Sequence, residues 1–303
     1  MEKIAFVTQS YKPDFDVCKL LCKSIDRFSP NVDHYIFVND EDVKLFKSLQ
    51  YKNHYVLGKS TILPWFFIRF PFKIAGHIFY LSPFTIPMRE WIMQQICKLG
   101  VFEVIGNQYD AVFNIDSETI LLKNFDINSL YKDGKYRLYR TDNVLLEDAH
   151  FEYCKSIKKF FGNKAPSDDK LYKYNYMDMP VCFVKDSLQK MLKLIAKNSI
   201  YKNWKLALAN TYRFSENYTY GNYVINVEGE KNHYLTSQKI IPVLHSKNYK
   251  NGDSLYQAIM QVMNANSNMI GIVLQKTDRA KGTNYLDIDE IQSVFNRFLS
   301  KIQ

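Results

Sequence analysis

The sequence predicts an α/β fold in which a mixed, mostly parallel sheet is covered by helices. In the N-terminal third, short apolar runs alternate with amphipathic segments, which is typical of strand–helix–strand units in a parallel sheet. The 303 residues are 47% hydrophobic and 23% charged, which excludes a disordered chain and is enough for one large domain. Only 11 glycines and 9 prolines are present, which excludes collagen-like and linker-rich proteins.

The first elements follow from the spacing of the apolar residues. Ile4–Thr8 is a continuous apolar run between polar residues and is expected to be a buried, central strand. Asp14–Arg27 carries apolar residues at helical spacing and is expected to be an amphipathic helix. The same criteria predict strands at His34–Val38 and Tyr55–Leu57 and a helix at Glu41–Leu49. Parallel strands joined by right-handed crossovers end at one edge of the sheet, so a ligand site is expected there.

An aromatic segment, residues 62–84, comes next and is expected to be an ordered loop. Its side chains form either packed core or an exposed lip that touches an acceptor or a membrane. Packed core is the preferred interpretation, because large exposed apolar patches are unusual. Met88–Leu99 is then expected to be an amphipathic helix that ends at Gly100. Tyr109–Ile115 is the next buried strand and leads directly into Asp116-Ser117-Glu118.

The second half of the chain is less regular, and no Ser-, Gly- or Pro-rich linker separates it from the first half. We therefore expect a single domain, residues 1–250, with a helical C-terminal extension, residues 251–303, packed on it. The expected elements are strands at Met179–Val184 and Ile240–Leu244 and helices at Asp186–Lys197, Ser254–Met263 and Ile288–Ile302, the first of them capped by Asp186. Ser215–Val227 is expected to be a helix or a helix followed by a strand.

The formal net charge of +9 allows two interpretations. A basic surface attracts nucleotide phosphates, anionic lipid or nucleic acid, whereas most lysines of a lysine-rich protein simply form a solvated surface. We favour the solvated surface and predict no nucleic acid partner. No apolar stretch resembles a membrane-spanning helix or a signal peptide. A cytoplasmic protein is therefore expected, and peripheral contact with the cytoplasmic face of the membrane remains an option.

The cysteines and histidines show no metal-binding pattern in the sequence. There is no Cys-x-x-Cys pair and no Cys/His zinc spacing, and the five cysteines are an odd number, so buried free thiols are expected. His34 and His77 each sit among apolar residues without acidic neighbours in the sequence, which makes both weaker site candidates.

Familiar catalytic motifs are absent: the sequence contains no Gly-x-Gly-x-x-Gly, Walker lysine loop, Gly-x-Ser-x-Gly or His-Glu-x-x-His. Instead, Asp116 and Glu118 follow the buried strand that ends at Ile115. Two carboxylates at this spacing can turn towards one hard cation, such as Mg²⁺ or Mn²⁺, which also accepts diphosphate oxygens and water. The alternative is an ordinary strand-ending turn that solvates two acidic side chains.

Four segments follow one another over about the first 250 residues: Ile4-Ala5-Phe6-Val7-Thr8-Gln9-Ser10-Tyr11 with Asp14, Arg89-Glu90-Trp91-Ile92-Met93-Gln94-Gln95-Ile96-Cys97-Lys98-Leu99, Asn114-Ile115-Asp116-Ser117-Glu118 and Phe214-Ser215-Glu216-Asn217-Tyr218-Thr219-Tyr220-Gly221. In this order they resemble the GT-A glycosyltransferases, a fold that uses sugar nucleotides with an Asp-x-Asp metal motif. More closely, the chain resembles a bacterial family of uncharacterised GT-A-like proteins found near polysaccharide genes. That family usually has a second Asp where this chain has Glu118, whose longer carboxylate can still bind a cation.

The resemblance implies a nucleotide-sugar site. By position, the nucleoside is held by the residues that follow the first strand, Thr8, Gln9, Ser10 and Asp14. Gln95 and Lys98, on the helix before the acidic motif, are expected to reach the phosphate or the sugar. For Lys98, a favourable charge at the C-terminus of that helix is the alternative.

The resemblance also implies a metal and a catalytic base. Asp116 and Glu118 would hold Mn²⁺ or Mg²⁺ against the diphosphate, and His245 is expected on the metal or the diphosphate. A hydrogen-bonded structural histidine is the alternative for His245. Glu216 matches the base that takes the acceptor's proton in inverting GT-A enzymes. Alternatively, Ser215 caps a helix and Glu216 stabilises its first turn.

The predicted function is therefore a metal-assisted glycosyltransferase. It would move a sugar from a nucleotide-diphosphate sugar to a glycan or lipid-linked acceptor in bacterial capsule or lipopolysaccharide synthesis. One alternative is a sugar-phosphate nucleotidyltransferase, which usually opens with a Gly-rich phosphate loop that is lacking between Thr8 and Asp14. Another is a carbohydrate- or membrane-binding module, which would not need the acidic residues.

Overall fold

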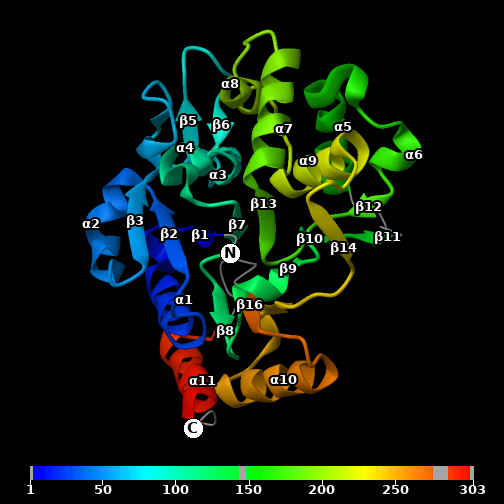
Figure 1. Ribbon diagram of the computed structural model, residues 1–303. Helices are drawn as coiled ribbons and strands as arrows, with labels where there is room; N and C mark the ends of the chain where they lie inside the picture. Colours follow the sequence, from blue (N-terminus) through cyan, green and yellow to red (C-terminus); the bar gives the residue numbers. More distant parts are fainter. Residues whose placement is uncertain (1–2, 143–147, 276–285, 301–303) are drawn as a thin grey trace.

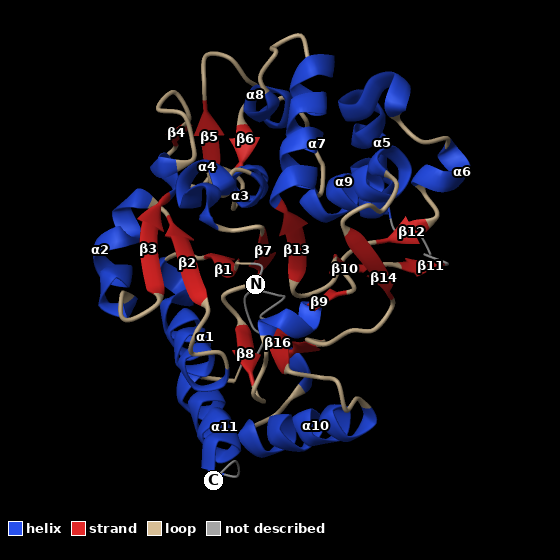
Figure 2. Ribbon diagram, viewed as in Figure 1, coloured by secondary structure: helices blue, strands red, loops and turns tan. Residues whose placement is uncertain are grey.

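The computed structural model describes residues 3–142, 148–275 and 286–300, and its centre is a five-stranded sheet of order β13-β7-β1-β2-β3 (Figure 1, Figure 2). The strands of this central sheet are β1 (Ile4–Gln9), β2 (Asp33–Val38), β3 (His54–Gly58), β7 (Ala111–Asn114) and β13 (Val181–Val184). β7, β1, β2 and β3 are parallel, whereas β13 runs antiparallel to β7. The predicted mixed, mostly parallel sheet with β1 at its centre is confirmed.

Helices cover both faces of this sheet. Alternate residues of a strand point to opposite sides, and in β1 the residues on both sides are apolar and need covering. Ala5 and Val7 of β1 belong to one buried cluster, which also contains residues of α3, α5, α7, α8 and α9. Ile4 and Phe6 belong to a second cluster, which contains residues of α1, α10 and α11. These helices are α1 (Phe15–Phe28), α3 (Glu90–Leu99), α5 (Asp148–Phe161), α7 (Lys185–Asn198), α8 (Trp204–Ala209), α9 (Glu216–Tyr223), α10 (Gly252–Ala265) and α11 (Ile288–Ser300).

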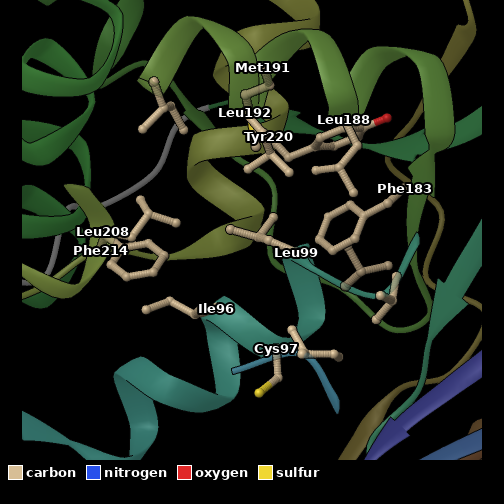
Figure 3. Packing of buried hydrophobic residues seen from close by; sticks show 14 of the residues in the cluster. Ile96, Cys97, Leu99, Phe183, Leu188, Met191, Leu192, Leu208, Phe214 and Tyr220 are labelled. Atoms are coloured by element: carbon tan, nitrogen blue, oxygen red, sulfur yellow. The ribbon is translucent and has the colours of Figure 1, made fainter. Parts of the chain in front are cut away.

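Helix α9 is fixed against the central sheet by aromatic packing, which Figure 3 shows from close by. The rings of Phe183 of β13 and Tyr220 of α9 have centroids 4.9 Å apart. The Tyr220 hydroxyl also accepts a hydrogen bond from the backbone N–H of Val184 at 2.9 Å. At Gly221, an added Cβ would lie 2.3 Å from the ring of Tyr176, so only glycine permits this approach. The start of α9 is therefore held rigidly.

Three predicted helices differ from the structure at their ends. The predicted helix Glu41–Leu49 is interrupted: only α2 (Val43–Phe46) is α-helical, and tight 3-10 turns flank it. The predicted helix at Met88 begins two residues later, because Met88–Arg89 pairs as strand β6. The helix α7 begins at Lys185, and Asp186 makes no cap but forms an ion pair with Lys190 one turn later. Two further short helices are α4 (Phe102–Ile105) and α6 (Asp168–Leu171).

Four small sheets surround the central one, and sequence spacing predicted few of their strands. The sheet β15-β16-β8 joins the C-terminal extension to the rest of the chain, because β16 lies between the other two strands. Residues 251–303 therefore supply a strand as well as helices. The small sheets comprise β15 (Val243–His245), β16 (Gly271–Gln275) and β8 (Thr119–Leu121); β14 (His233–Thr236), β10 (Lys135–Tyr139) and β9 (Tyr131–Lys132); β11 (Thr141–Asp142) and β12 (Tyr174–Asn175); and β4 (Ile68–Arg69), β5 (Phe79–Leu81) and β6 (Met88–Arg89).

The aromatic segment 62–84 is only partly core. Phe67 and Tyr80 are buried, but Trp65 is 88% exposed and Phe72 69% exposed. The packed-core interpretation is therefore wrong for the tip of this segment. Among the described residues, none of the helices combines the length and the apolar character needed to cross a bilayer. All five cysteines are buried and free, as the sequence predicted.

Candidate functional site

A cavity of about 820 Å³ opens at the C-terminal edge of the central sheet. Gln9, which ends β1, and Asp14, which follows it, line one part of the cavity, and Asp116, which follows β7, lines another. β1 and β7 are parallel neighbours, so the residues after them meet at one edge of the sheet. Lys98, in the last turn of α3, completes this wall. The structure therefore places the end of β1 and the acidic motif in one cleft, as the sequence predicted.

Lys98 joins two carboxylates that are distant in the sequence. Its Nζ lies 3.0 Å from Glu216 Oε1 and 3.6 Å from Asp116 Oδ1. Burial lowers the pKa of Lys98, but the charges of Glu216 and Asp116 outweigh this effect and raise it above the ordinary lysine value. The ammonium group is therefore charged throughout the neutral range.

Glu216 is the first residue of α9, the position that the helix-capping alternative predicts. The Ser215 side chain accepts a hydrogen bond from the backbone N–H of Tyr218, so Ser215 is the N-cap of α9. The Gln95 side-chain oxygen accepts from the backbone N–H of Glu216 at 2.8 Å. The Glu216 side chain is 8% exposed and does not itself line the cavity, which it meets through Lys98. Gln95 thus holds the backbone of α9 rather than lining the cavity.

Thr8 and Ser10 are buried behind the cavity wall rather than in it. The Thr8 hydroxyl donates to the carbonyl of Ile115 at 3.0 Å and lies 2.8 Å from His34 Nε2. The backbone N–H of Ser10 donates to Phe37 at 2.9 Å. Both residues therefore connect β1 to its neighbouring strands.

Gln9, between these two residues, faces the cavity. The two polar atoms of its side-chain amide are buried and make no hydrogen bond within the described structure. Buried polar groups are nearly always paired, so an unpaired amide in a cavity wall is suited to binding a polar ligand.

The three predicted metal ligands lie in the same region but are not gathered around one point. Asp116 is 47% exposed, and the Glu118 side chain lines the cavity. His245 ends β15 in register with Gln275, and Gln275 lines the cavity whereas His245 does not. Across the described ranges, the only group of three or more His, Cys, Asp and Glu side chains whose ligand atoms all lie within 4.8 Å of one another consists of Cys22, His34 and His54.

Sequence reasoning missed several cationic residues of the cavity. Arg89 and Arg213 line it, and their guanidinium carbons lie 5.9 Å and 5.6 Å from the ring centroid of Tyr212. Arg89 is the first residue of one of the four segments described above and Arg213 directly precedes another, which was the available signal. Lys73 and His77 reach the cavity from the loop before β5. The apolar neighbours of His77 in the sequence gave no indication of this position.

Similar solved structures were found at low sequence identity. The galactosyltransferase LgtC in complex with donor and acceptor sugar analogues is 10% identical, with 97% of this chain and 95% of that chain covered and a TM-score of 0.46. Mouse xyloside xylosyltransferase 1 is 8% identical, with 92% and 99% covered and a TM-score of 0.44. Core-mannan synthase A from Aspergillus fumigatus, in an Mn/GDP form, is 10% identical, with 78% and 73% covered and a TM-score of 0.47.

A comparison of the sequence with curated proteins gives no match. In contrast, the model of a protein family matches residues 4–269, a range that includes the central sheet and every residue named above for the cavity wall except Gln275. The chain therefore belongs to this family, which is described as a family of unknown function (DUF6492).

Proposed function

We propose that the protein is a glycosyltransferase that moves a sugar from a nucleotide-diphosphate sugar to an acceptor hydroxyl. The observation that carries this proposal is the Lys98 contact with both Asp116 and Glu216 at the wall of a cavity of about 820 Å³. Sugar transfer needs positive charge beside the leaving diphosphate and a carboxylate that can accept the acceptor's proton. Both kinds of group meet here, and the cavity has the size of a small-molecule site.

We propose that the cavity wall recognises the donor. Arg89, Arg213 and Lys98 would bind the diphosphate, because guanidinium and ammonium groups pair with phosphate oxygens. The unpaired amide of Gln9 would bind the nucleoside, with Asp14 beside it. Thr8 and Ser10 would support this wall from behind by their bonds to neighbouring strands. Gln95 would support the cavity wall by accepting the hydrogen bond from the backbone N–H of Glu216.

The residues at the acidic motif fit a hard divalent cation. Asp116 and Glu118 present carboxylates to the same cavity, and oxygen ligands are those that Mg²⁺ and Mn²⁺ prefer. We propose that these two residues hold the ion, with His245 as a further ligand from the strand beside Gln275. A bound ion would supply charge neutralisation at the diphosphate. Lys98 lies 3.6 Å from Asp116 and therefore supplies positive charge at the same place.

Glu216 is the proposed base. In the donor complex, the diphosphate would compete with Glu216 for Lys98, which would release the carboxylate to accept the proton of the acceptor hydroxyl.

Glu216→Gln should keep the shape of the side chain and retain donor binding, while transfer falls by about 10²–10⁴, the usual contribution of a positioned base. A matched control is Glu103→Gln, because Glu103 also pairs with a lysine, Lys205, but lies away from the cavity. Transfer by Glu216→Gln within a few-fold of the Glu103→Gln rate would contradict this role.

We propose that the acceptor is a glycan or a lipid-linked sugar of a bacterial surface polysaccharide, reached from the cytoplasmic face of the membrane. Trp65, Ile68 and Phe72 expose large apolar side chains on the segment that also supplies Lys73 and His77 to the cavity. Exposed apolar side chains next to a site are typical of contact with a membrane or an amphipathic partner. The net charge of +9 favours anionic lipid.

The proposal is tested by melting temperature in the presence of UDP- and GDP-sugars, with and without Mn²⁺. A ligand that binds the folded protein raises the melting temperature according to its concentration and affinity. We expect one nucleotide-diphosphate sugar to raise it, and transfer to a glycan acceptor to follow in a product assay. A shift with nucleoside triphosphate and sugar phosphate, and none with any nucleotide-diphosphate sugar, would instead support a nucleotidyltransferase.

A further inference from the structure

A second polar cluster lies on the α1 side of the central sheet, away from the cavity. It consists of Cys22 of α1, His34 of β2 and His54 of β3, all buried. One ligand atom from each lies within 4.8 Å of the others. The residues around it are apolar, including Ile36, Val38 and Val56. Three metal-binding side chains from three elements thus converge in an otherwise apolar layer.

Hydrogen bonding fixes the proton of His34. The Thr8 hydroxyl has one hydrogen, and it donates this hydrogen to the carbonyl of Ile115. Towards His34 Nε2, at 2.8 Å, Thr8 can therefore only accept, so Nε2 carries the proton. In a neutral imidazole, Nδ1 then has a free lone pair.

The same reasoning applies to His54. Its Nε2 lies 3.4 Å from Asp26 Oδ1, and a carboxylate favours a proton on the nitrogen that faces it. Nδ1 of His54 lies 3.0 Å from Nδ1 of His34. A proton on Nδ1 of His54 would make this contact a hydrogen bond, whereas a proton on Nε2, which the carboxylate of Asp26 favours, leaves both Nδ1 lone pairs free for a metal ion.

Sulfur ligands are available beside the two imidazoles. Cys22 contributes its thiol to the cluster. Cys18, one helical turn earlier on α1, is fully buried beside Cys22 but lies outside the group within 4.8 Å, so its side chain would have to turn towards the imidazoles to bind the same ion. Two thiols and two imidazoles form a Cys₂His₂ set, which is one of the common tetrahedral zinc sites. Metal-bound histidines usually donate their other nitrogen to an oxygen acceptor, and here Thr8 and Asp26 already stand at those nitrogens.

We propose that Cys18, Cys22, His34 and His54 form a structural Zn²⁺ site that ties α1 to β2 and β3, with Thr8 and Asp26 as its outer hydrogen-bond partners. These thiol and imidazole ligands differ from the carboxylates of the cavity, which suit a hard ion. The Asp26 side chain is 35% exposed, so this outer partner lies closer to solvent than the buried ligands. This inference is independent of the proposed transferase activity.

The test is a Co²⁺ titration of the full chain, stripped of metal and kept reduced with a phosphine. We expect one equivalent of Co²⁺ to produce a thiolate-to-cobalt charge-transfer band with the visible bands of a tetrahedral ion, and Zn²⁺ to abolish them. Cys22→Ser should weaken the charge-transfer band, and the double variant Cys18→Ser with Cys22→Ser should lose it. Cys154→Ser should keep it, because Cys154 is equally buried but belongs to another cluster. Asp116→Ala should also keep it, which separates this site from the cavity.

Asp26→Asn gives a second measurement that does not depend on folding of the cysteine variant. Loss of an outer partner typically weakens metal binding about 10–100-fold, so Zn²⁺ affinity should fall by that factor while one ion still binds. The proposal is overturned if wild type gives no charge-transfer band, if Cys22→Ser takes up Co²⁺ with the same spectrum, or if Asp26→Asn binds Zn²⁺ as tightly as wild type.

Discussion

Removal of the Lys98 ammonium group tests whether its ion pairs with Glu216 and Asp116 stabilise the fold. In Lys98→Met the side chain keeps its length but loses its charge, and the Glu216 carboxylate, 8% exposed, loses the ammonium that lies 3.0 Å from it. Asp116 is 47% exposed and stays hydrated, so the cost arises mainly at Glu216. Removing one partner of a buried pair costs about 3–5 kcal/mol. Because Lys98 is itself 19% exposed, we expect a cost just below this range, about 2–3 kcal/mol.

The measurement is urea unfolding with linear extrapolation, which gives the free energy of unfolding when the slope is unchanged. The matched control is Lys190→Met, because Lys190 pairs with Asp186 on the surface, with side chains 53% and 60% exposed. That exposed pair should contribute about 0.5 kcal/mol or less. The double variant Lys98→Met with Glu216→Gln should recover part of the loss, since no buried charge is left unpaired. Equal losses in Lys98→Met and Lys190→Met would refute the reasoning.

Three further predictions concern the cation, the pH dependence and the packing of α9. Asp116→Ala should abolish Mn²⁺-dependent binding of the nucleotide sugar, whereas Asp142→Ala should not; calorimetry showing unchanged cation dependence in a folded Asp116→Ala protein would exclude this assignment. Burial lowers the pKa of His233 to about 3 in the folded protein, whereas the unfolded value is about 6.5. Between these two pH values only the unfolded chain binds this proton. The free energy of unfolding should therefore fall by about 1.4 kcal/mol per pH unit as the pH decreases from about 6.5 to about 3. His233→Gln should show a shallower fall between pH 7 and pH 5, and an identical slope would contradict the prediction. Gly221→Ala should lower the stability by about 1–3 kcal/mol, because the new Cβ meets the Tyr176 ring. Without that clash, alanine would stabilise the helix by up to about 1 kcal/mol. A lower melting temperature would therefore support the clash, and a higher one would contradict it.

The central sheet could be predicted because the apolar pattern within each of its strands can be recognised without reference to the rest of the chain. The apolar run Ile4–Gln9 and the amphipathic helix Phe15–Phe28 need no distant partner to be recognised. The small sheets are different, because their strands are two to five residues long and several of them pair with strands far along the chain. Gly271 pairs with Leu121, for example, and neither neighbourhood indicates the other. Short strands defined by long-range pairing leave almost no local signal.

For the candidate site, too, only the features that depend on local sequence could be predicted. Position after a strand was sufficient to place Asp116 and Gln9 in one cleft, because parallel strands share an edge. The two-residue alternation of a strand puts Thr8 on the face of Ile4 and Phe6, opposite Gln9, so its burial was also readable from the sequence.

Contacts between distant residues were not readable in this way. The ion pair of Lys98 with Glu216 joins residues 118 positions apart. The convergence of Cys22 with His34 and His54 depends on the crossing of a helix over two strands.

The position of strand β16 has a consequence for the order in which the chain can fold during synthesis. The central sheet is complete once residue 184 has left the ribosome, since β13 ends there. Strand β8, which directly follows the acidic motif, pairs with β16, and the carbonyl of Glu118 accepts a hydrogen bond from Leu274 at 3.0 Å. A nascent chain shorter than about 275 residues therefore exposes β8 as an unpaired edge, and exposed edges promote association between chains. The wall that carries Glu118 and Gln275 is among the last parts of the protein to form.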